Sequence, residues 1–174
     1  MTEVAHDPLY SLAHLTLINA TTPELIYIAD RAGYDAVSPR FIPMNVPGEF
    51  KQSPIDNQMI AATKIALKTT GIKVLDIELA RITEDCDPRN FERALELGGE
   101  LGAKRMIMSA WTTDRTDRNF ILDCFSETCE IAYQYGLSVD LEFPSFSRLR
   151  TLDEALDIVR AAKQPNGGIL VDTL

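Results

Sequence analysis

Residues 168–172 read GILVD, and residues 137–142 read LSVDLE. Each is a short, mainly apolar run that ends in a carboxylate, Asp172 in the first run and Glu142 in the second. Such runs are typical of β-strands that are buried on both faces. Because a predicted helix separates them, we expect two parallel strands of one sheet, whose carboxyl ends bring both acids to the same edge.

A repeating unit extends this pattern along the chain: an amphipathic helix, a glycine, and then a short apolar strand. The glycines of the repeat are Gly33, Gly71, Gly102, Gly136 and Gly168, at intervals of 31 to 38 residues. A glycine after a helix supplies the left-handed residue that ends it. This interval suits a βα unit, so the chain is expected to be a series of such units.

The expected elements follow from this unit. Strands are predicted at residues 11–17, 36–38, 73–78, 105–109, 137–142 and 168–172, and helices at 22–32, 55–69, from Asp87, at 117–135 and from Thr151. Thr151 and Glu154 form a capping box, and a long proline-rich loop spans residues 39–54.

This order predicts an α/β fold of the (β/α)8 TIM-barrel type, with a doubly wound sheet as the alternative. The first predicted turn carries no glycine-rich phosphate loop, which counts against that alternative. A closed barrel has eight strands, whereas about six strands and five helices are predicted here. We therefore expect residues 1–174 to be one incomplete barrel domain that lacks its C-terminal strands 7 and 8.

The composition narrows the possible partners and the location. A net charge of −9 and a pI near 4.7 make nucleic acid and anionic membrane surfaces poor partners. No apolar run is long enough to span a bilayer, and residues 1–7 do not resemble a signal peptide, so a cytoplasmic protein is expected. Cys86, Cys124 and Cys129 form no CxxC pair, which predicts buried or partly buried free thiols.

Glu142 and Asp172 are the first candidates for chemistry. A carboxylate at the end of an apolar strand needs a cation or hydrogen-bond donors to offset its desolvation. Oxygen ligands favour Mg²⁺ or Mn²⁺, and an added histidine would admit Co²⁺, Fe²⁺ or Zn²⁺. The alternative is that each acid caps a loop or pairs with Arg or Lys.

Three further residues are candidates for binding substrate, each with a structural alternative. Glu78 ends a predicted strand and could bind substrate or pair with Arg81. His14 lies in the first predicted strand and could serve the site or sit in the core. Trp111 follows a strand and could wall a sugar pocket or pack. The loop at residues 39–54 could act as a lid over the pocket or be an ordered loop without a role in binding.

The chain resembles the xylose-isomerase-like barrel superfamily, which includes sugar-phosphate isomerases and epimerases, inosose dehydratase and the type IV AP endonucleases. The segments that carry the resemblance are AGYDAV at 32–37, VLDIE at 74–78, LGAK at 101–104, LEF at 141–143 and VDTL at 171–174. The resemblance covers essentially the whole chain as the first six units of the barrel.

The resemblance implies that Glu142 and Asp172 bind a divalent metal ion, Mn²⁺, Mg²⁺, Co²⁺ or Zn²⁺. In the family a His on strand 7 and a Glu on strand 8 complete the site, and these have no counterpart here. The implied reaction is isomerisation or epimerisation of a sugar, sugar phosphate or related hydroxy-ketone through an enediolate, with Glu142 also acting as acid or base.

Other functions remain open from the sequence. A dehydratase of the inosose or 3-dehydroshikimate type, or a non-catalytic barrel that binds a small molecule, would fit the same fold. A DNA-repair endonuclease is disfavoured by two histidines and the charge of −9. The implied partner is a small carbohydrate, and a homo-oligomer is possible.

Overall fold

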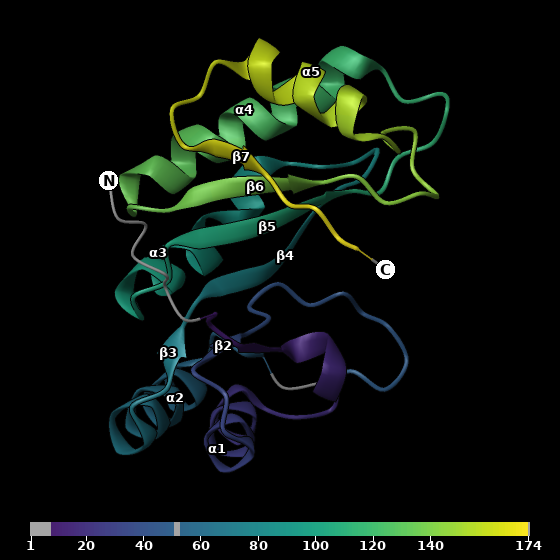
Figure 1. The fold of residues 1–174 in the computed structure, drawn as a ribbon. Coiled ribbons are helices and arrows are strands. Elements are labelled where there is room, and N and C mark those ends of the chain that lie inside the picture. The colour runs from purple at the N-terminus through teal and green to yellow at the C-terminus, as the bar shows by residue number, and fades with distance from the viewer. Residues whose placement is uncertain (1–7, 51–52, 174) are drawn as a thin grey trace, which may run out of the picture.

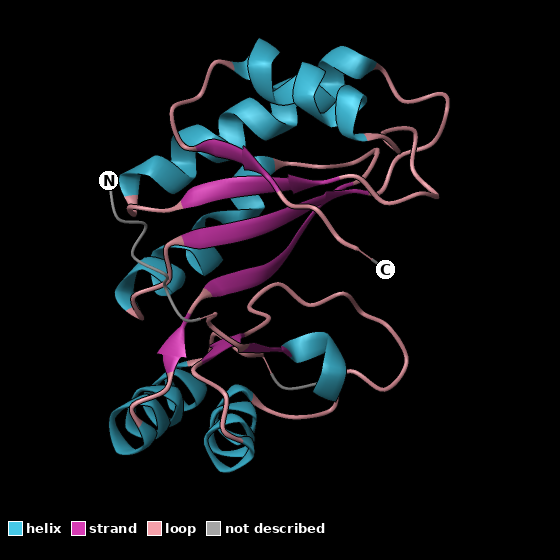
Figure 2. Cartoon of the chain, in the orientation of Figure 1, coloured by secondary structure: helices cyan, strands magenta, loops and turns pink. Residues whose placement is uncertain are grey.

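A computed structural model describes residues 8–50 and 53–173 (Figures 1 and 2). The elements are, in order, β1 (Ser11–Ala13), η1 (His14–Leu17), α1 (Thr22–Ala32), β2 (Ala36–Ser38), α2 (Asn57–Thr70), β3 (Lys73–Val74), β4 (Asp76–Ile82), η2 (Pro88–Phe91), α3 (Glu92–Glu100), β5 (Arg105–Ala110), α4 (Arg118–Gln134), β6 (Ser138–Glu142), α5 (Leu152–Ala162) and β7 (Gly167–Ile169). The segment weighed above as a signal peptide lies outside the described residues.

All the strand pairs are parallel, and they run in sequence order. One sheet has the order β1-β2-β3 and the other β4-β5-β6-β7. A parallel bridge between Arg40 and Glu78 joins the two sheets, supported by backbone hydrogen bonds from Phe41 N to Glu78 O and from Glu78 N to Pro39 O, of 3.1 and 2.9 Å. The helices lie around the outside of the curved strands (Figure 1). The prediction of a partial α/β barrel is therefore confirmed.

Three of the predicted strands differ from the observed ones by more than one residue. The strand predicted at 73–78 is two strands, because Leu75 accepts from Lys104 N on one side while it donates to Val37 O on the other, so the chain changes neighbours there. The first strand stops at Ala13, and the next four residues form η1. The last strand ends at Ile169, so Asp172 follows it in a loop instead of closing it.

Helix ends were predictable because their signals are local. Helix α1 has the predicted bounds, and a capping box between Thr21 and Glu24 precedes it. The predicted box of Thr151 and Glu154 is present at α5. The glycine rule fails once: the left-handed residue after α5 is Lys163, with φ of 53°, while Gly168 belongs to β7.

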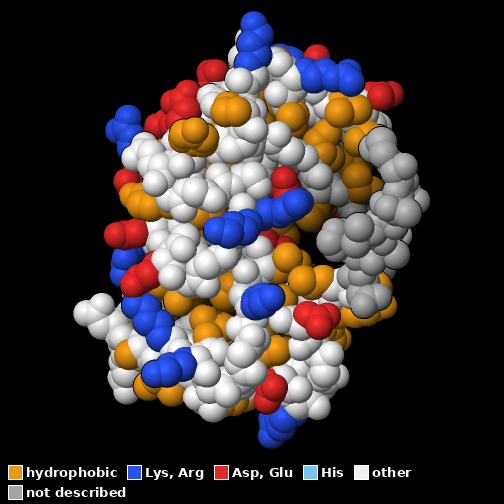
Figure 3. Space-filling view, turned by 60° about the vertical axis from the view of Figure 1, so that its left-hand side comes forward, with side chains coloured by type: hydrophobic (Ala, Val, Ile, Leu, Met, Phe, Trp, Pro, Cys, Tyr) orange, Lys and Arg blue, Asp and Glu red, His pale blue; other side chains and the backbone are white. Residues whose placement is uncertain are grey.

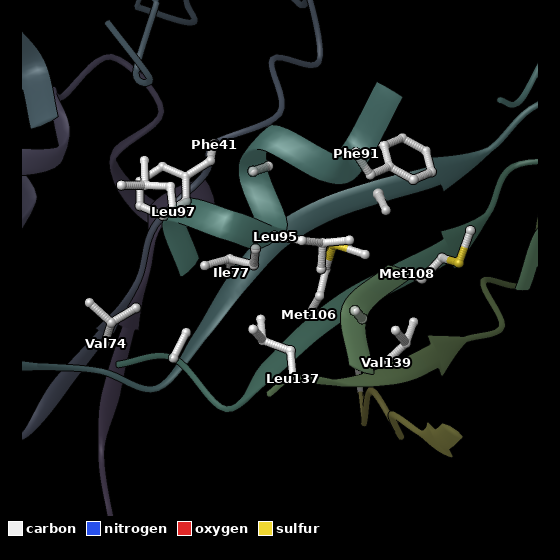
Figure 4. Packing of buried hydrophobic residues seen from close by; sticks show 14 of the residues in the cluster. Phe41, Val74, Ile77, Phe91, Leu95, Leu97, Met106, Met108, Leu137 and Val139 are labelled. Atoms are coloured by element: carbon white, nitrogen blue, oxygen red, sulfur yellow. The ribbon is translucent and has the colours of Figure 1, made fainter. Parts of the chain in front are cut away.

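The core lies between the strands and the outer helices. Ile77, Met106 and Val139, from β4, β5 and β6, pack with Leu95 and Leu97 of α3 (Figure 4). The prediction for the thiols is also confirmed: Cys124 and Cys129 are buried, Cys86 is partly buried, and all three are free.

Charged side chains of both signs lie on the surface of the molecule. Acidic and basic side chains are interspersed over the face drawn in Figure 3. Within the described part of the chain, no helix is both long and apolar enough to cross a bilayer.

Helix α3 approaches its neighbour closely through a pair of glycines. A Cβ atom on Gly99 would lie 2.6 Å from the backbone oxygen of Tyr135 at the end of α4. A Cβ atom on Gly98 would meet side-chain atoms of Ile77 and Leu137 at 3.0 Å or more. Backbone cannot give way as readily as a side-chain tip, so Gly99 is the position that requires glycine.

We predict that Gly99→Ala lowers the free energy of unfolding by about 1–3 kcal/mol, because overpacking at a rigid contact outweighs the helix propensity that alanine adds. Gly98→Ala, one residue away on the same helix, should cost less. Urea denaturation of both variants measures the difference. Equal stability of the two would show that the contact at Tyr135 relaxes freely.

Candidate functional site

Strand register places one set of polar side chains on the inner face of the barrel. Arg81, Ser109 and Glu142 are successive partners across β4, β5 and β6. Paired residues of parallel strands point to the same face, and alternate residues point to the other. The neighbours Met108 and Leu141 are fully buried in the hydrophobic core. The first three side chains therefore share the inner face, at the carboxyl ends of the strands.

Glu142 is the last residue of β6 and is half-buried. Its carboxylate makes no hydrogen bond or ion pair with any described residue, unlike Asp140 two residues earlier, which pairs with Arg105 at 3.3 Å. A half-buried acid without a protein partner is open to a cation or a ligand donor.

Asp172 lies at the same edge of the sheet but further along its strand. The pairing of β6 with β7 continues as far as a hydrogen bond of 3.1 Å from Leu170 N to Leu141 O. Asp172 follows two residues later and is exposed. The two acids predicted as a pair thus follow adjacent strands in the same direction, Glu142 within its strand and Asp172 in the loop beyond.

The carboxylate oxygens of Glu142 and Asp172 suit a divalent cation, but two side chains are too few to hold one. Carboxylate oxygens are the ligands that Mg²⁺ and Mn²⁺ prefer. Over residues 8–50 and 53–173, however, no group of three or more His, Cys, Asp or Glu side chains is placed to hold an ion. Glu142 and Asp172 are only two ligating side chains, and a complete coordination sphere needs others.

Trp111 forms an aromatic shelf beside Ser109, the register partner of Glu142. It follows β5 directly, and its indole N–H donates to the Ser109 hydroxyl at 3.1 Å. The Arg81 guanidinium lies over the ring at 5.0 Å from its centroid, and Phe146 meets it edge-on with centroids 5.5 Å apart. Two ring contacts and a hydrogen bond hold the indole in place, with the Arg81 guanidinium over the ring, and the residue is only partly buried.

Glu78 is buried in the middle of β4 and pairs with Arg40, not with Arg81 as the alternative interpretation held. The Arg40 guanidinium donates to its carboxylate at 3.1 Å, and the two residues are 5% and 7% exposed. Burial raises the pKa of Glu78 to about 7, and the charge of Arg40 limits that rise. Since β4 continues to Ile82, Glu78 does not end its strand.

His14 has both ring nitrogens engaged by the backbone. Nδ1 accepts from the Arg40 N–H at 2.9 Å, and Nε2 lies 2.9 Å from the Ala20 oxygen. This pattern requires the tautomer with its proton on Nε2. Burial lowers the pKa of His14, which favours the neutral ring. His14 therefore holds the start of the loop after β2 in place.

Sequence reasoning placed Arg81 here only as a partner for Glu78, and its two options for Phe146 were the wall of the pocket and the core. The alternation along β4 could have found Arg81, but a register shift between Ile77 and Ala80 changes which residues face inward. Phe146 reaches Trp111 across the loop after β6, a contact that no local pattern predicts.

A family model described as xylose isomerase-like TIM barrel matches residues 26–174. The chain belongs to this family. No curated protein sequence matches the chain significantly.

Solved structures share this xylose isomerase-like barrel at low sequence identity. The IOLI protein with a bound zinc atom is 20% identical, with a TM-score of 0.72 over 94% of this chain and 62% of its own. The 3-keto-D-glucoside 4-epimerase YcjR from E. coli is 17% identical, with a TM-score of 0.71 over 93% of this chain and 67% of its own.

A third structure has a sugar bound. The D-allulose 3-epimerase from Methylomonas sp. in complex with D-allulose is 17% identical, with a TM-score of 0.65 over 94% of this chain and 64% of its own. The chain thus spans less than two thirds of the IOLI protein and of this epimerase. At these identities the likeness establishes the fold.

The buried carboxyl group of Glu78 gives a prediction about how the stability of the protein changes with pH. A carboxyl group whose folded pKa is raised binds more protons in the folded state, so its contribution to stability is full below the unfolded pKa and is lost as pH rises through about 7. Glu78→Gln should remove this loss. Thermal melts of both proteins from about pH 4 to 8 should show their stability difference changing mainly between the two pKa values. A constant difference would contradict the raised pKa.

Proposed function

We propose that this chain carries the acid–base half of a sugar isomerase or epimerase site that moves a proton next to a carbonyl group. The observation that carries the proposal is the Glu142 carboxylate, which has no partner among the described residues and lies in register with Ser109, the residue that hydrogen-bonds Trp111. The substrate class is a sugar, sugar phosphate or related hydroxy-ketone.

Glu142 would act as the base. Its carboxylate takes the proton from the carbon next to the carbonyl, and the electron pair of that C–H bond forms the enediolate. Return of a proton to the opposite face of the same carbon gives the epimer, and return to the former carbonyl carbon gives the isomer. Both reactions conserve atoms and electrons, so neither needs a redox partner.

A divalent cation held by Glu142 and Asp172, with further ligands from outside the described residues, would polarise the carbonyl oxygen. Support for a cation comes from the carboxylate donors and from the bound zinc that the name of the IOLI structure reports for that protein. The same two acids would orient the reacting carbons above the inner face.

Trp111 and Arg81 would bind the sugar next to this acid. The fixed indole offers an apolar face for the C–H groups of a sugar ring or chain, and the guanidinium offers hydrogen-bond donors. Family membership and the two epimerases among the similar structures support a carbohydrate as the substrate.

We predict that the chain, given Mn²⁺ and D-allulose in D₂O, exchanges the proton next to the carbonyl for deuterium, and that Glu142→Gln slows this exchange by at least about 100-fold. Proton NMR of the sugar measures the rate. Glu96→Gln is the matched control, since Glu96 is an exposed acid of α3 paired with Arg93. The proposal fails if the wild-type chain shows no exchange or if Glu142→Gln retains it.

Binding can be tested apart from activity, because Trp111 is the only tryptophan of the chain. D-allulose stacked on the shelf should change the intrinsic fluorescence in a saturable way. Arg81→Met should weaken this response several-fold by removing the contact over the indole ring. A fluorescence that does not respond to the sugar would argue against the shelf as its binding surface.

A further inference from the structure

A small cavity lies under the loop after β2, apart from the candidate site. It encloses about 390 Å³ including its mouth. Its lining includes His14, Thr22, Arg40 and Glu49 among mainly apolar neighbours. Neither Glu142 nor Trp111 is among the residues that line it. The cavity therefore offers a separate place for a ligand.

Two buried side chains in its lining have hydrogen-bonding atoms that the protein does not use. Among the described residues, the Nε and Nη1 atoms of Arg40, a residue only 5% exposed, have no hydrogen-bond partner, and neither has the hydroxyl of Thr22, at 1%. Leaving a buried donor unsatisfied costs about 1–3 kcal/mol. Such atoms are retained where a ligand or water completes them.

The charges around the cavity are already balanced or negative. Arg40 faces two carboxylates, Glu78 at 3.1 Å and Glu49 at 3.8 Å. His14, the remaining titratable group in the lining, has both ring nitrogens engaged by backbone atoms. What Arg40 lacks is hydrogen-bond acceptors and not negative charge, so a neutral oxygen suits it better than an anion.

Glu49 adds an acceptor at the same place. Its carboxylate is held by the backbone N–H groups of Met44 and Asn45 at 2.9 and 2.6 Å, which leaves lone pairs for a further donor. A hydroxyl group can accept from Arg40 or Thr22 and donate to Glu49 at once. A carbonyl oxygen could satisfy only the first of these.

The size of the cavity and the chemistry of its walls determine which ligand it can bind. The enclosed part has room for about two groups of water size, which excludes a whole sugar ring. Apart from Thr21, the walls that remain are apolar and suit C–H groups: Ile18, Ala20, Pro43, Phe50, Pro54 and Met59. We propose that this cavity binds the hydroxyl-bearing end of a small neutral polyol, with Arg40 and Thr22 as donors and Glu49 as acceptor. This inference does not depend on the proposed function.

Glycerol is the probe, and inorganic phosphate is the charged comparison. Amide chemical shifts of the labelled chain are followed by NMR during titration with each. Glycerol should give saturable shifts confined to residues around the cavity. Thr22→Val should weaken the affinity for glycerol about fivefold, which corresponds to about 1 kcal/mol of binding free energy. Thr69→Val is the matched control, since Thr69 is exposed on α2 and outside the lining.

Thr22→Val also separates a binding role from a structural one. Removing an unsatisfied buried hydroxyl should leave the melting temperature unchanged or higher, so weaker binding would not reflect unfolding. Arg40→Lys keeps the charge and removes the guanidinium donors. In the folded variant, the affinity for glycerol should be weaker still. Saturable shifts with phosphate alone, shifts unaffected by Thr22→Val, or no saturable shift at all (a cavity that holds only water) would each overturn the proposal.

Discussion

The barrel depends on the contact between Arg40 and Glu78, where its two sheets become one. Backbone hydrogen bonds on both sides of Glu78 tie β4 to the end of β2, and the guanidinium of Arg40 closes on its carboxylate. Both side chains are buried, so removing either would leave a charge or a polar group without compensation, a far larger cost than that of losing an exposed pair such as Lys64–Glu100. The pair thus adds a buried side-chain contact to the backbone bridge between the two sheets.

Once that junction is set, register alone determines what the inner face presents. From Ala80 of β4 onward, beyond the register shift, the partners on β4, β5 and β6 are consecutive, so a side chain on one strand lies level with a known side chain on the next. Glu142 therefore lies beside Ser109, whose hydroxyl orients Trp111. The acid and the aromatic surface are placed by backbone pairing, which is more rigid than a loop and is what a site that handles one proton requires.

The sequence was informative where the determining forces are local. Capping residues and apolar periodicity located α1 and α5, and apolar runs located the strands apart from some of their ends and from the division of residues 73–82 into β3 and β4. It was uninformative where the outcome depends on distant partners. Nothing in the spacing shows that Glu78 meets Arg40 instead of Arg81, because the two candidate arginines differ only in where the chain brings them. The paths of His14 and Asp172 depend likewise on hydrogen bonds made outside their own segments.

Three arginines, Arg40, Arg81 and Arg105, interact with groups other than Glu142. Arg40 compensates Glu78, Arg105 compensates Asp140, and Arg81 lies on Trp111 and donates to the Met44 oxygen. Each of these guanidinium groups interacts with a group other than Glu142, and the acid at the end of β6 has no partner among the described residues. In a chain with net charge −9, an unpaired acid on an inner face adds repulsion and gains nothing for folding. Its position becomes favourable only when a cation or a ligand proton comes to it, which is the condition under which a carboxylate there can do chemistry.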